Sequence, residues 1–206
     1  MGKVVVELSM SLDGFIAGPN DARGNGLGDG GDQLFQWYSS GDIEFPLPGT
    51  EMVFKISRAS ADLLQETWPK VGASVTGRRT FDITGGWGGN PPGGTDARYF
   101  VVTHTVPQEW VKPASPFTFV TDGVESAVEQ AKQAAGDQNV DIMGASIVQQ
   151  GLKAGLIDEI QIDLAPVLLG AGVSLFGYLD CSPIELERIR VVEGVDVTHL
   201  LFRVVK

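Results

Sequence analysis

The feature that most constrains the fold of this chain is a strand that passes directly into a helix around residue 144. An apolar run at 140–143 ends in three small residues, and the apolar positions that follow have helical spacing, from Ile147 to Leu156. The small residues are Gly144, Ala145 and Ser146. Small residues let a ligand come close to the backbone, and the first amides of a helix are free to bind an anion. The pattern favours an α/β fold in which this turn is either a phosphate site or simply a tight connection.

Length and composition indicate a single domain that spans residues 1–206. A chain of 206 residues with 43% hydrophobic content can bury a substantial core. Its 15 basic and 26 acidic residues give a net charge of −11, which would repel nucleic acid. The single cysteine, Cys181, excludes an internal disulfide, and with only two histidines it argues against a His/Cys metal site. No apolar stretch is long enough to cross a membrane, so we expect a cytoplasmic protein.

Strands and helices alternate along most of the chain, which is typical of α/β layers. Strands are expected at 3–10, 71–76, 99–103, 117–121, 140–143 and 159–164, and helices at 57–68, 124–135 and 147–155. The last two strands, 184–193 and 197–205, are joined by Gly194 and indicate an antiparallel hairpin. We therefore predict a mixed, mostly parallel sheet. The glycine-rich stretches 18–33 and 85–94 are expected to be surface loops or flaps over a ligand.

A second strand-to-helix turn, VTGRRTFDI at 75–83, carries positive charge. The strand ends at Gly77, Arg78 and Arg79 follow, and Thr80 is placed to cap or begin a helix. Positive charge at a helix N-terminus opposes the macrodipole by about 0.3 to 1 kcal/mol. An anion between the two arginines would remove this conflict. The pattern favours a phosphate site over two solvated arginines on an acidic protein.

A third strand, YFVVTHT at 99–105, brings Thr103 and His104 to its carboxyl end. Ligands of open α/β sheets bind outside the carboxyl ends of the strands. His104 could therefore contact a ribose or a phosphate, and a lone histidine in a surface loop is the alternative. His199 falls within a hairpin strand and is expected to be structural. The run GNGLGDGG is not a dinucleotide fingerprint, because no strand leads into it and no helix follows at the required point.

Taken in order, the segments SLDGFIAGPND, VTGRRTFD, VVTHT, IMGAS and GLIDEIQIDLAPVLLGAG make the chain similar to the dihydrofolate reductase superfamily. The resemblance is greatest to the branch formed by the C-terminal reductase domain of the bacterial bifunctional riboflavin-biosynthesis deaminase/reductase and its stand-alone relatives. It covers the whole chain, which starts at the reductase strand and is expected to be a stand-alone member. The resemblance implies a three-layer α-β-α domain that binds NADPH.

The resemblance also implies which residues bind the coenzyme. The pyrophosphate and the 2′-phosphate of NADPH would be held by Gly77, Arg78, Arg79 and Thr80, with the adenosine end beside Thr103 and His104. A second phosphate turn would be formed by Gly144, Ala145, Ser146 and Ile147. The residues implied near the nicotinamide, around the Asp13-Gly14 turn, are Ser9, Ile16 and Ala17.

Dihydrofolate reductases carry a carboxylate, on the helix before the GRRT-type turn, that orients the substrate and assists proton delivery. The resemblance implies Asp62 for this role. Asp62 could equally stabilise the first turn of its own helix. Asp13 is a second candidate, although an Asp-Gly turn accounts for it without chemistry.

The leading hypothesis is an NADPH-dependent reductase that transfers a hydride to a small heterocycle or a ribosylaminopyrimidine. Trp87 and the glycine-rich loops would close over the substrate, and Trp37 or Phe35 would offer a stacking surface; core packing is the alternative for each. The alternative function is a nucleotide-binding module that keeps the NADPH site without efficient catalysis. A homodimer is expected, because the apolar segment 164–175 and the terminal hairpin could be covered by a twin subunit, unless they belong to the core.

Overall fold

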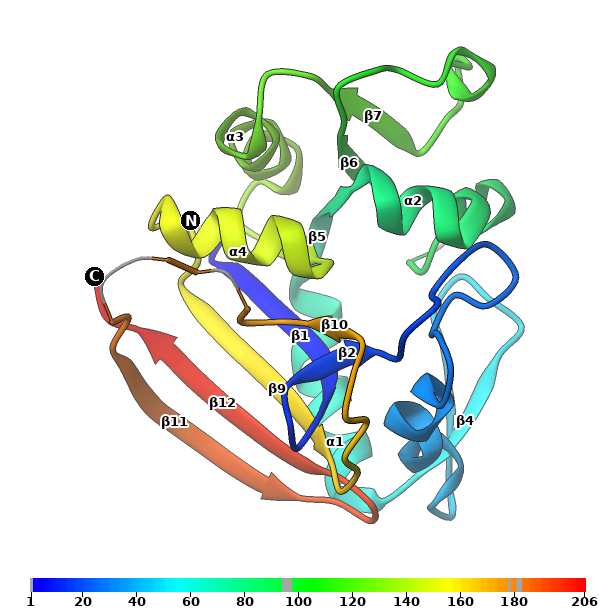
Figure 1. The fold of residues 1–206 in the computed structure, drawn as a ribbon, viewed down its shortest axis with the longest axis vertical. Coiled ribbons are helices and arrows are strands. Elements are labelled where there is room, and N and C mark those ends of the chain that lie inside the picture. Colours follow the sequence, from blue (N-terminus) through cyan, green and yellow to red (C-terminus); the bar gives the residue numbers. More distant parts are fainter. Residues whose placement is uncertain (1, 94–97, 178, 181–182) are drawn as a thin grey trace.

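The computed structural model describes residues 2–93, 98–177, 179–180 and 183–206 (Figure 1). Its centre is an eight-stranded sheet in the order β11-β12-β9-β1-β8-β5-β6-β7. Most of this sheet consists of strands that pair in parallel: β1 (Val4–Ser11), β5 (Val71–Gly77), β6 (Tyr99–Val102), β7 (Phe117–Val120), β8 (Asn139–Met143) and β9 (Glu159–Ala165). The hairpin of β11 (Leu186–Glu193) and β12 (Thr198–Val204) joins β9 through antiparallel pairing of β12. The mixed sheet and the C-terminal antiparallel hairpin are therefore confirmed.

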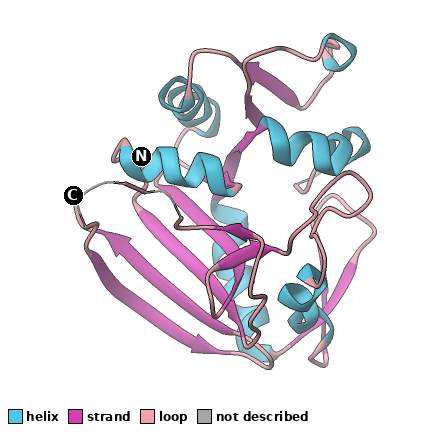
Figure 2. Ribbon diagram, viewed as in Figure 1, coloured by secondary structure: helices cyan, strands magenta, loops and turns pink. Residues whose placement is uncertain are grey.

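Helices lie on both faces of the sheet, which gives the three-layer α-β-α arrangement that the resemblance implied (Figures 1 and 2). α3 (Val124–Ala135) and α4 (Ala145–Lys153) cover one face. α1 (Arg58–Thr67) lies behind the sheet in Figure 1 and packs with the 3-10 helix η1 (Gly31–Ser39) on the opposite face. α2 (Arg78–Thr84) directly follows β5. Among the described residues, no helix is long and apolar enough to cross a membrane.

The remaining elements are short. The hairpin of β3 (Ile43–Pro46) and β4 (Val53–Ile56) packs against η1 and α1, and β2 (Phe15–Ala17) pairs with β10 (Val173–Ser174). The 3-10 turns among the described residues, besides η1, are η2 (Trp68–Lys70), η3 (Gly85–Gly89) and η5 (Gln108–Trp110). The sequence patterns did not predict the β2–β10 pair, the β3–β4 hairpin or η1. β2 and β10 are distant in the chain, whereas β3 and β4 are short neighbouring strands joined by a loop. Cys181 and Gly94, the last residue of the second glycine-rich stretch, lie outside the described residues.

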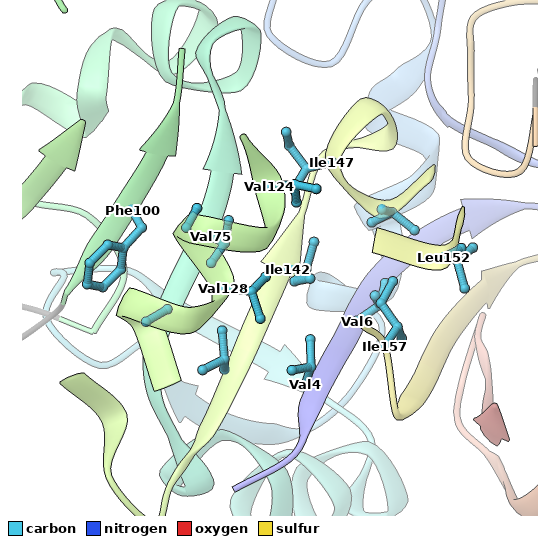
Figure 3. Packing of buried hydrophobic residues seen from close by; sticks show 14 of the residues in the cluster. Val4, Val6, Val75, Phe100, Val124, Val128, Ile142, Ile147, Leu152 and Ile157 are labelled. Atoms are coloured by element: carbon cyan, nitrogen blue, oxygen red, sulfur yellow. The ribbon is translucent and has the colours of Figure 1, made fainter. Parts of the chain in front are cut away.

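The face of the sheet under α3 and α4 is apolar, because alternate strand positions carry β-branched or other apolar side chains. Val4 and Val6 of β1 and Ile142 of β8 are fully buried there. Figure 3 shows these side chains beneath Val128 of α3 and Ile147 of α4. This cluster is the main hydrophobic core of the protein and fixes the position of α4 against the sheet.

The opposite face of the same strands is polar, although helices cover it as well. The side chains on this face of the adjacent strands β9, β1, β8 and β5 include hydroxyl, amide and carboxyl groups. They belong to Glu7, Ser9, Ser74, Asp141, Gln161 and Asp163. Polar groups under a covering layer need partners or a solvent-filled space. The functional site is therefore to be sought on this face.

The helices α1 and α3 begin and end at residues that the local sequence marks as helix ends. Ser57 caps α1, where its hydroxyl accepts a hydrogen bond from the Ser60 amide at 3.2 Å, and Pro69 follows the helix. α3 spans the predicted residues and ends at Gly136, whose φ is +62°. Local sequence thus determines where these helices begin and end.

Candidate functional site

The three turns identified in the sequence lie side by side at one edge of the sheet. β8, β5 and β6 are adjacent parallel strands, in which Thr76 is opposite Met143 and Gly77 is opposite Val102. Because the strands run in the same direction, the residues that follow them leave the sheet at the same edge. The structure thus brings the GRRT turn, the Thr103-His104 turn and the Gly-Ala-Ser turn together.

Two of these turns are in direct contact, and glycine is required where they meet. Gly144 has a φ of +91°, and a Cβ added there would lie 2.7 Å from Oγ1 of Thr80. A Cβ at Gly77 would lie 3.1 Å from Cγ1 of Ile147, which is a tight contact. The close approach of α2 and α4 therefore depends on these glycines.

The two arginines of the GRRT turn already have acidic partners in the chain. Arg78 donates to Asp82 at 2.7 Å and to the carbonyl of Thr105 at 2.9 Å. Arg79 forms an ion pair with Asp21 at 2.6 Å, and this pair raises the pKa of Arg79. The conflict with the helix dipole, from which the sequence argument inferred a bound anion, is thus relieved by carboxylates of the protein. Arg79 also ties the glycine-rich stretch 18–33 to α2.

Of the other residues that the resemblance implies for coenzyme binding, some are exposed and some are buried. Gly77 is the N-cap residue of α2, so Thr80 is not a cap. Thr103 is buried and its hydroxyl donates to the carbonyl of Thr105 at 2.9 Å, whereas His104 is exposed. In α4, Ala145 is half-buried, Ser146 is exposed and Ile147 is buried. Ser9 and Ala17 are buried, and Ile16 packs against the main core.

A cavity of about 750 Å³ lies between the polar face of the sheet and the layer that contains η1, α1 and β3. Its aromatic lining consists of Phe35, Tyr38, Phe45, Trp68 and Tyr99. Ser9 and Met143 also line it. Since Met143 directly precedes Gly144, the cavity begins next to the turns and extends away from them along the sheet.

Three carboxyl groups line this cavity, and the sequence interpretation did not single out any of them. They are Glu7 of β1, Asp141 of β8 and Asp163 of β9. In the sheet register, Asp141 is opposite Val5 and Asp163 is opposite Ser9, so Glu7 lies between them and the three acids form a diagonal across three strands. The acidic positions of the alternating strands could have been recognised in the sequence.

Burial makes two of these acids hard to ionise. Desolvation raises the pKa of Asp141 to about 7, although a hydrogen bond from the Glu7 backbone opposes the change. Desolvation also raises the pKa of Glu7 well above its ordinary value, and the nearby charge of Asp163 adds to this effect. Glu7 is held in position by the indole N–H of Trp68, which donates to Oε1 at 2.6 Å. Burial therefore favours the protonated forms of Glu7 and Asp141.

Asp163 belongs to a buried chain of hydrogen bonds that leads away from the cavity. Its Oδ1 lies 2.7 Å from Nδ1 of His199, and Nε2 of His199 lies 2.9 Å from the hydroxyl of Ser60. The side chain of Gln161 donates to the same Oδ1 at 3.1 Å. His199 and Ser60 are fully buried, which agrees with the structural role expected for His199.

The acid implied by the resemblance is not at the cavity. The side chain of Asp62 is 58% exposed and lies 3.8 Å from Arg58 one turn earlier in α1. Asp13 accepts hydrogen bonds from Ser11 and from the amides of Leu169 and Gly170, and so ties the β1–β2 turn to the segment after β9. The Ser11 hydrogen bond is the main cause of the lowered pKa of Asp13.

The aromatic residues expected to face the substrate are divided between cavity and core. Phe35 lines the cavity. Trp37 is buried in the core, with its indole N–H on the hydroxyl of Ser9 at 3.1 Å. Trp87 packs against Tyr99, with ring centroids 5.2 Å apart, in a second aromatic cluster. Phe35 is thus the candidate that has a surface for stacking.

With this geometry established, comparison with known proteins identifies the family. The RibD C-terminal domain matches residues 2–196 of the chain. The chain belongs to the RibD C-terminal domain family. The resemblance to riboflavin-biosynthesis reductases is therefore confirmed, and the family is reductase-like.

Solved structures similar to this RibD C-terminal domain include a putative riboflavin biosynthesis protein from Shewanella sp. PV-4, with 25% identity, 99% of both chains covered and a TM-score of 0.68. The diaminohydroxyphosphoribosylaminopyrimidine deaminase/5-amino-6-(5-phosphoribosylamino)uracil reductase of Thermotoga maritima is 16% identical with a TM-score of 0.58 over 99% of this chain and 57% of that one. Dihydrofolate reductase from Enterococcus faecalis, solved with NADP(H), is 14% identical with a TM-score of 0.50 over 100% and 98% of the chains. The last two similarities show the shared fold.

Proposed function

We propose that this protein is an NADPH-dependent reductase that transfers a hydride to a small heterocycle bound in the cavity. The observation that carries the proposal is the meeting of the three turns at the end of a cavity with aromatic walls and proton-holding acids. A coenzyme along the turns would have its phosphates at the sheet edge and its reactive ring toward Ser9 and Met143.

The residues at the sheet edge suit a diphosphate coenzyme. By helix geometry, the amides of Ala145 and Ser146 lack acceptors within α4 and are available for a phosphate. The guanidinium groups of Arg78 and Arg79 remain partly exposed beside this turn, and each keeps N–H groups that Asp82, Thr105 and Asp21 do not use. In this proposal Ser9, Ile16 and Ala17 border the nicotinamide, and Thr103 and His104 the adenosine end.

NADPH, when bound, supplies the hydride. Phe35 and Tyr38 orient a flat ring and exclude water from it. A reduction also consumes a proton, and the cavity acids are placed to provide it. Because Oε1 of Glu7 accepts from Trp68, its other carboxyl oxygen is the one that holds a transferable proton. A binding module without catalysis is not favoured, since it leaves these buried acids unused.

Ser146→Asp is expected to weaken NADPH binding by about 10- to 100-fold, because it adds a negative charge where a phosphate is proposed to bind. The same charge is favourable to α4, since an acidic residue in the first turn complements the helix dipole. Stability should therefore stay the same or rise. Titration calorimetry with NADPH and thermal unfolding measure the two effects separately.

The matched control for this experiment is Ser146→Asn, which is similar in size and uncharged and should change NADPH affinity by less than about threefold. Wild-type protein that shows no NADPH binding would overturn the proposed function. Steady-state NADPH oxidation with a panel of small heterocycles then tests turnover.

A homodimer through the C-terminal hairpin is a further proposal. In the apolar segment 164–175, Leu175 and Ala165 are buried in the protomer, whereas Leu168 is exposed. The outer strand β11 also exposes Leu186, Ile189 and Val191. Ile189→Lys should convert dimers into monomers in light scattering, and wild-type protein that is monomeric at working concentration would refute the dimer.

Three other sequence expectations stay proposals: one domain over residues 1–206, a cytoplasmic location, and no nucleic-acid partner. The net charge of −11 supports the last, because it disfavours contact with a phosphate backbone. A single cooperative unfolding transition would support the first.

A further inference from the structure

We infer that the cavity binds a planar organic cation, an amidinium or a protonated amino heterocycle that carries no phosphate group. That this cation is a substrate rests on the proposed function, whereas the cation site itself rests on the cavity. The charge, the unpaired acceptor and the spacing of the acids each support it.

The charge of the lining is strongly one-sided. Glu7, Asp141 and Asp163 face the cavity, and Arg98 is the only lysine or arginine among the described residues that line it. Arg98 is exposed and donates to the carbonyl of Ala134 at 3.0 Å, so part of its hydrogen-bonding capacity is already used. A cationic ligand would gain attraction from these three acids.

Asp141 has an acceptor that nothing in the described part of the protein satisfies. Its Oδ1 is buried from solvent and has no hydrogen-bond partner among the described residues. A buried, unpaired carboxyl oxygen is costly, and a donor from a ligand would remove that cost. An N–H group of an amidinium or a protonated amine is such a donor.

The spacing of the acids favours an organic cation over a metal ion. Asp141 is opposite Val5 of β1 and Asp163 is opposite Ser9. These positions are four residues apart, which is about 13 Å along the strand. Among the described residues, no group of three His, Cys, Asp or Glu side chains is arranged to hold a metal ion. An extended, flat cation can contact Glu7 and Asp141 and stack on the aromatic walls, where the ring faces attract positive charge.

The same arrangement disfavours a phosphorylated ligand in the cavity. A phosphate would have to approach three acids and would find Arg98 as its only fixed cation among the described lining residues. At the sheet edge the situation is reversed, because Arg78 and Arg79 and the first turn of α4 lie there. Phosphate groups are thus suited to the coenzyme region, and the cavity is suited to a cation.

Protons and the cation should compete for the acids. Glu7 is faced by Asp163 of β9, Asp141 of β8 and Tyr38 of η1, with Trp68 and Thr67 as donors, while His199 lies behind Asp163. Without a ligand, protons neutralise part of this group. A bound amidinium, which keeps its charge at neutral pH, displaces a proton from the acids, so its affinity should rise with pH. One site with a pKa of about 7 predicts about a 10-fold gain between about pH 6 and pH 8.

The test uses three planar probes of nearly identical shape: benzamidine is cationic, benzamide is neutral and benzoate is anionic. Phenyl phosphate is a fourth probe, which carries a phosphate group. Calorimetry with the full chain and no coenzyme should show benzamidine binding at least about 10-fold more tightly than benzamide, and no binding of the two anions. Glu7→Gln keeps an acceptor for Trp68, so it should preserve the fold and weaken benzamidine by about 10- to 100-fold. Benzamide affinity should be unchanged in this variant.

Glu129→Gln is the matched control, since Glu129 is exposed on α3 across the sheet and should leave all affinities unchanged. Benzoate or phenyl phosphate binding as tightly as benzamidine, or equal benzamidine affinity in wild type and Glu7→Gln, would overturn the inference. NADPH is titrated in a separate experiment. Benzamidine binding without NADPH binding would contradict the reductase and leave the cation site standing, whereas the converse would contradict the cation site alone.

Discussion

Asp141→Asn is expected to stabilise the free protein by about 2 to 4 kcal/mol at about pH 8, because it removes a buried acid that must ionise at a cost. Each pKa unit corresponds to about 1.4 kcal/mol, and burial raises the pKa of Asp141 from 3.8 to about 7. Most single substitutions lower the stability of a folded protein. A gain of this size would therefore identify Asp141 as a residue kept at the expense of stability.

The sign of the effect depends on pH. Below a pH of 3.8 the carboxyl group is protonated in both the folded and the unfolded state, so the wild type has no penalty there. Between 3.8 and about 7 the unfolded chain loses the proton first, and the free energy of unfolding of the wild type falls as pH rises. The difference between Asp141→Asn and the wild type should thus grow from near zero in acid to a plateau above neutral pH.

Urea unfolding at a series of pH values measures this difference directly. Asp122→Asn, at an exposed position before α3, serves as the control and should change the free energy of unfolding by less than about 0.5 kcal/mol at each pH. A pH-independent difference for Asp141→Asn, or a loss of stability at every pH, would contradict the burial of an ionisable group at this position.

Stability and function are linked at this face of the sheet. A polar strand face could be filled with apolar side chains, as the opposite face is, and the free protein would gain stability. Glu7 and Asp141 occupy positions on this face that apolar side chains could fill, and their raised pKa values favour the protonated forms beside the cavity. Groups with such perturbed pKa values in a cavity are typical of binding and catalytic sites. The instability predicted for the free protein would then be removed when a cation or a substrate binds.

The turns of the site could be predicted from the sequence because each depends on neighbouring residues. A buried strand, a few small residues and the start of an amphipathic helix follow one another within about ten positions at Gly77 and at Gly144. The parallel order of the strands then fixes that such turns share one edge of the sheet. Local pattern and general topology together were sufficient here.

The cavity could not be predicted in the same way, although its acids alternate with apolar residues in β1 and β9. A strand with one polar face usually presents that face to solvent, so Glu7 and Asp163 had no feature that marks them as buried. Asp163 is buried and Glu7 half-buried because η1 and α1 cover this face. That packing depends on contacts between residues far apart in the chain, such as the hydrogen bond from Trp68 to Glu7, 61 residues apart. Asp62 was singled out from the same helix α1, whose other side faces the sheet.

The partner of Arg79 is also a residue that is distant in the chain and could not be predicted from local sequence. Two arginines at the start of a helix indicate a nearby anion, and from the sequence we expected a phosphate. The carboxylate of Asp21, 58 residues earlier, meets that requirement in the free protein. A local pattern can indicate that a charge needs a partner, but it cannot say which distant residue provides it.

His199→Ala is expected to lower the free energy of unfolding by about 3 to 5 kcal/mol, since it removes the centre of a buried hydrogen-bond chain and leaves a void. His199 of the C-terminal hairpin joins Asp163 of β9 to Ser60 of α1 at 2.7 and 2.9 Å. Without it, the described residues leave Oδ1 of Asp163 with the donor from Gln161 and the hydroxyl of Ser60 with that of Ser57. The hairpin, the sheet and α1 would lose their common link.

His199→Asn separates the hydrogen bonds from the packing. Its amide nitrogen can occupy the position of Nδ1 and donate to Asp163, but it does not reach Ser60, so a loss of about 1 to 2 kcal/mol is expected. Urea unfolding of both variants, alone and combined with Ser60→Ala, gives the coupling energies. If Ser60→Ala costs the same in the His199→Asn background as in the wild type, the Ser60–His199 hydrogen bond contributes nothing to stability. A coupling of about 1 kcal/mol would instead show that α1, which supports Trp68 and thereby Glu7, is fixed over the cavity through the C-terminal hairpin.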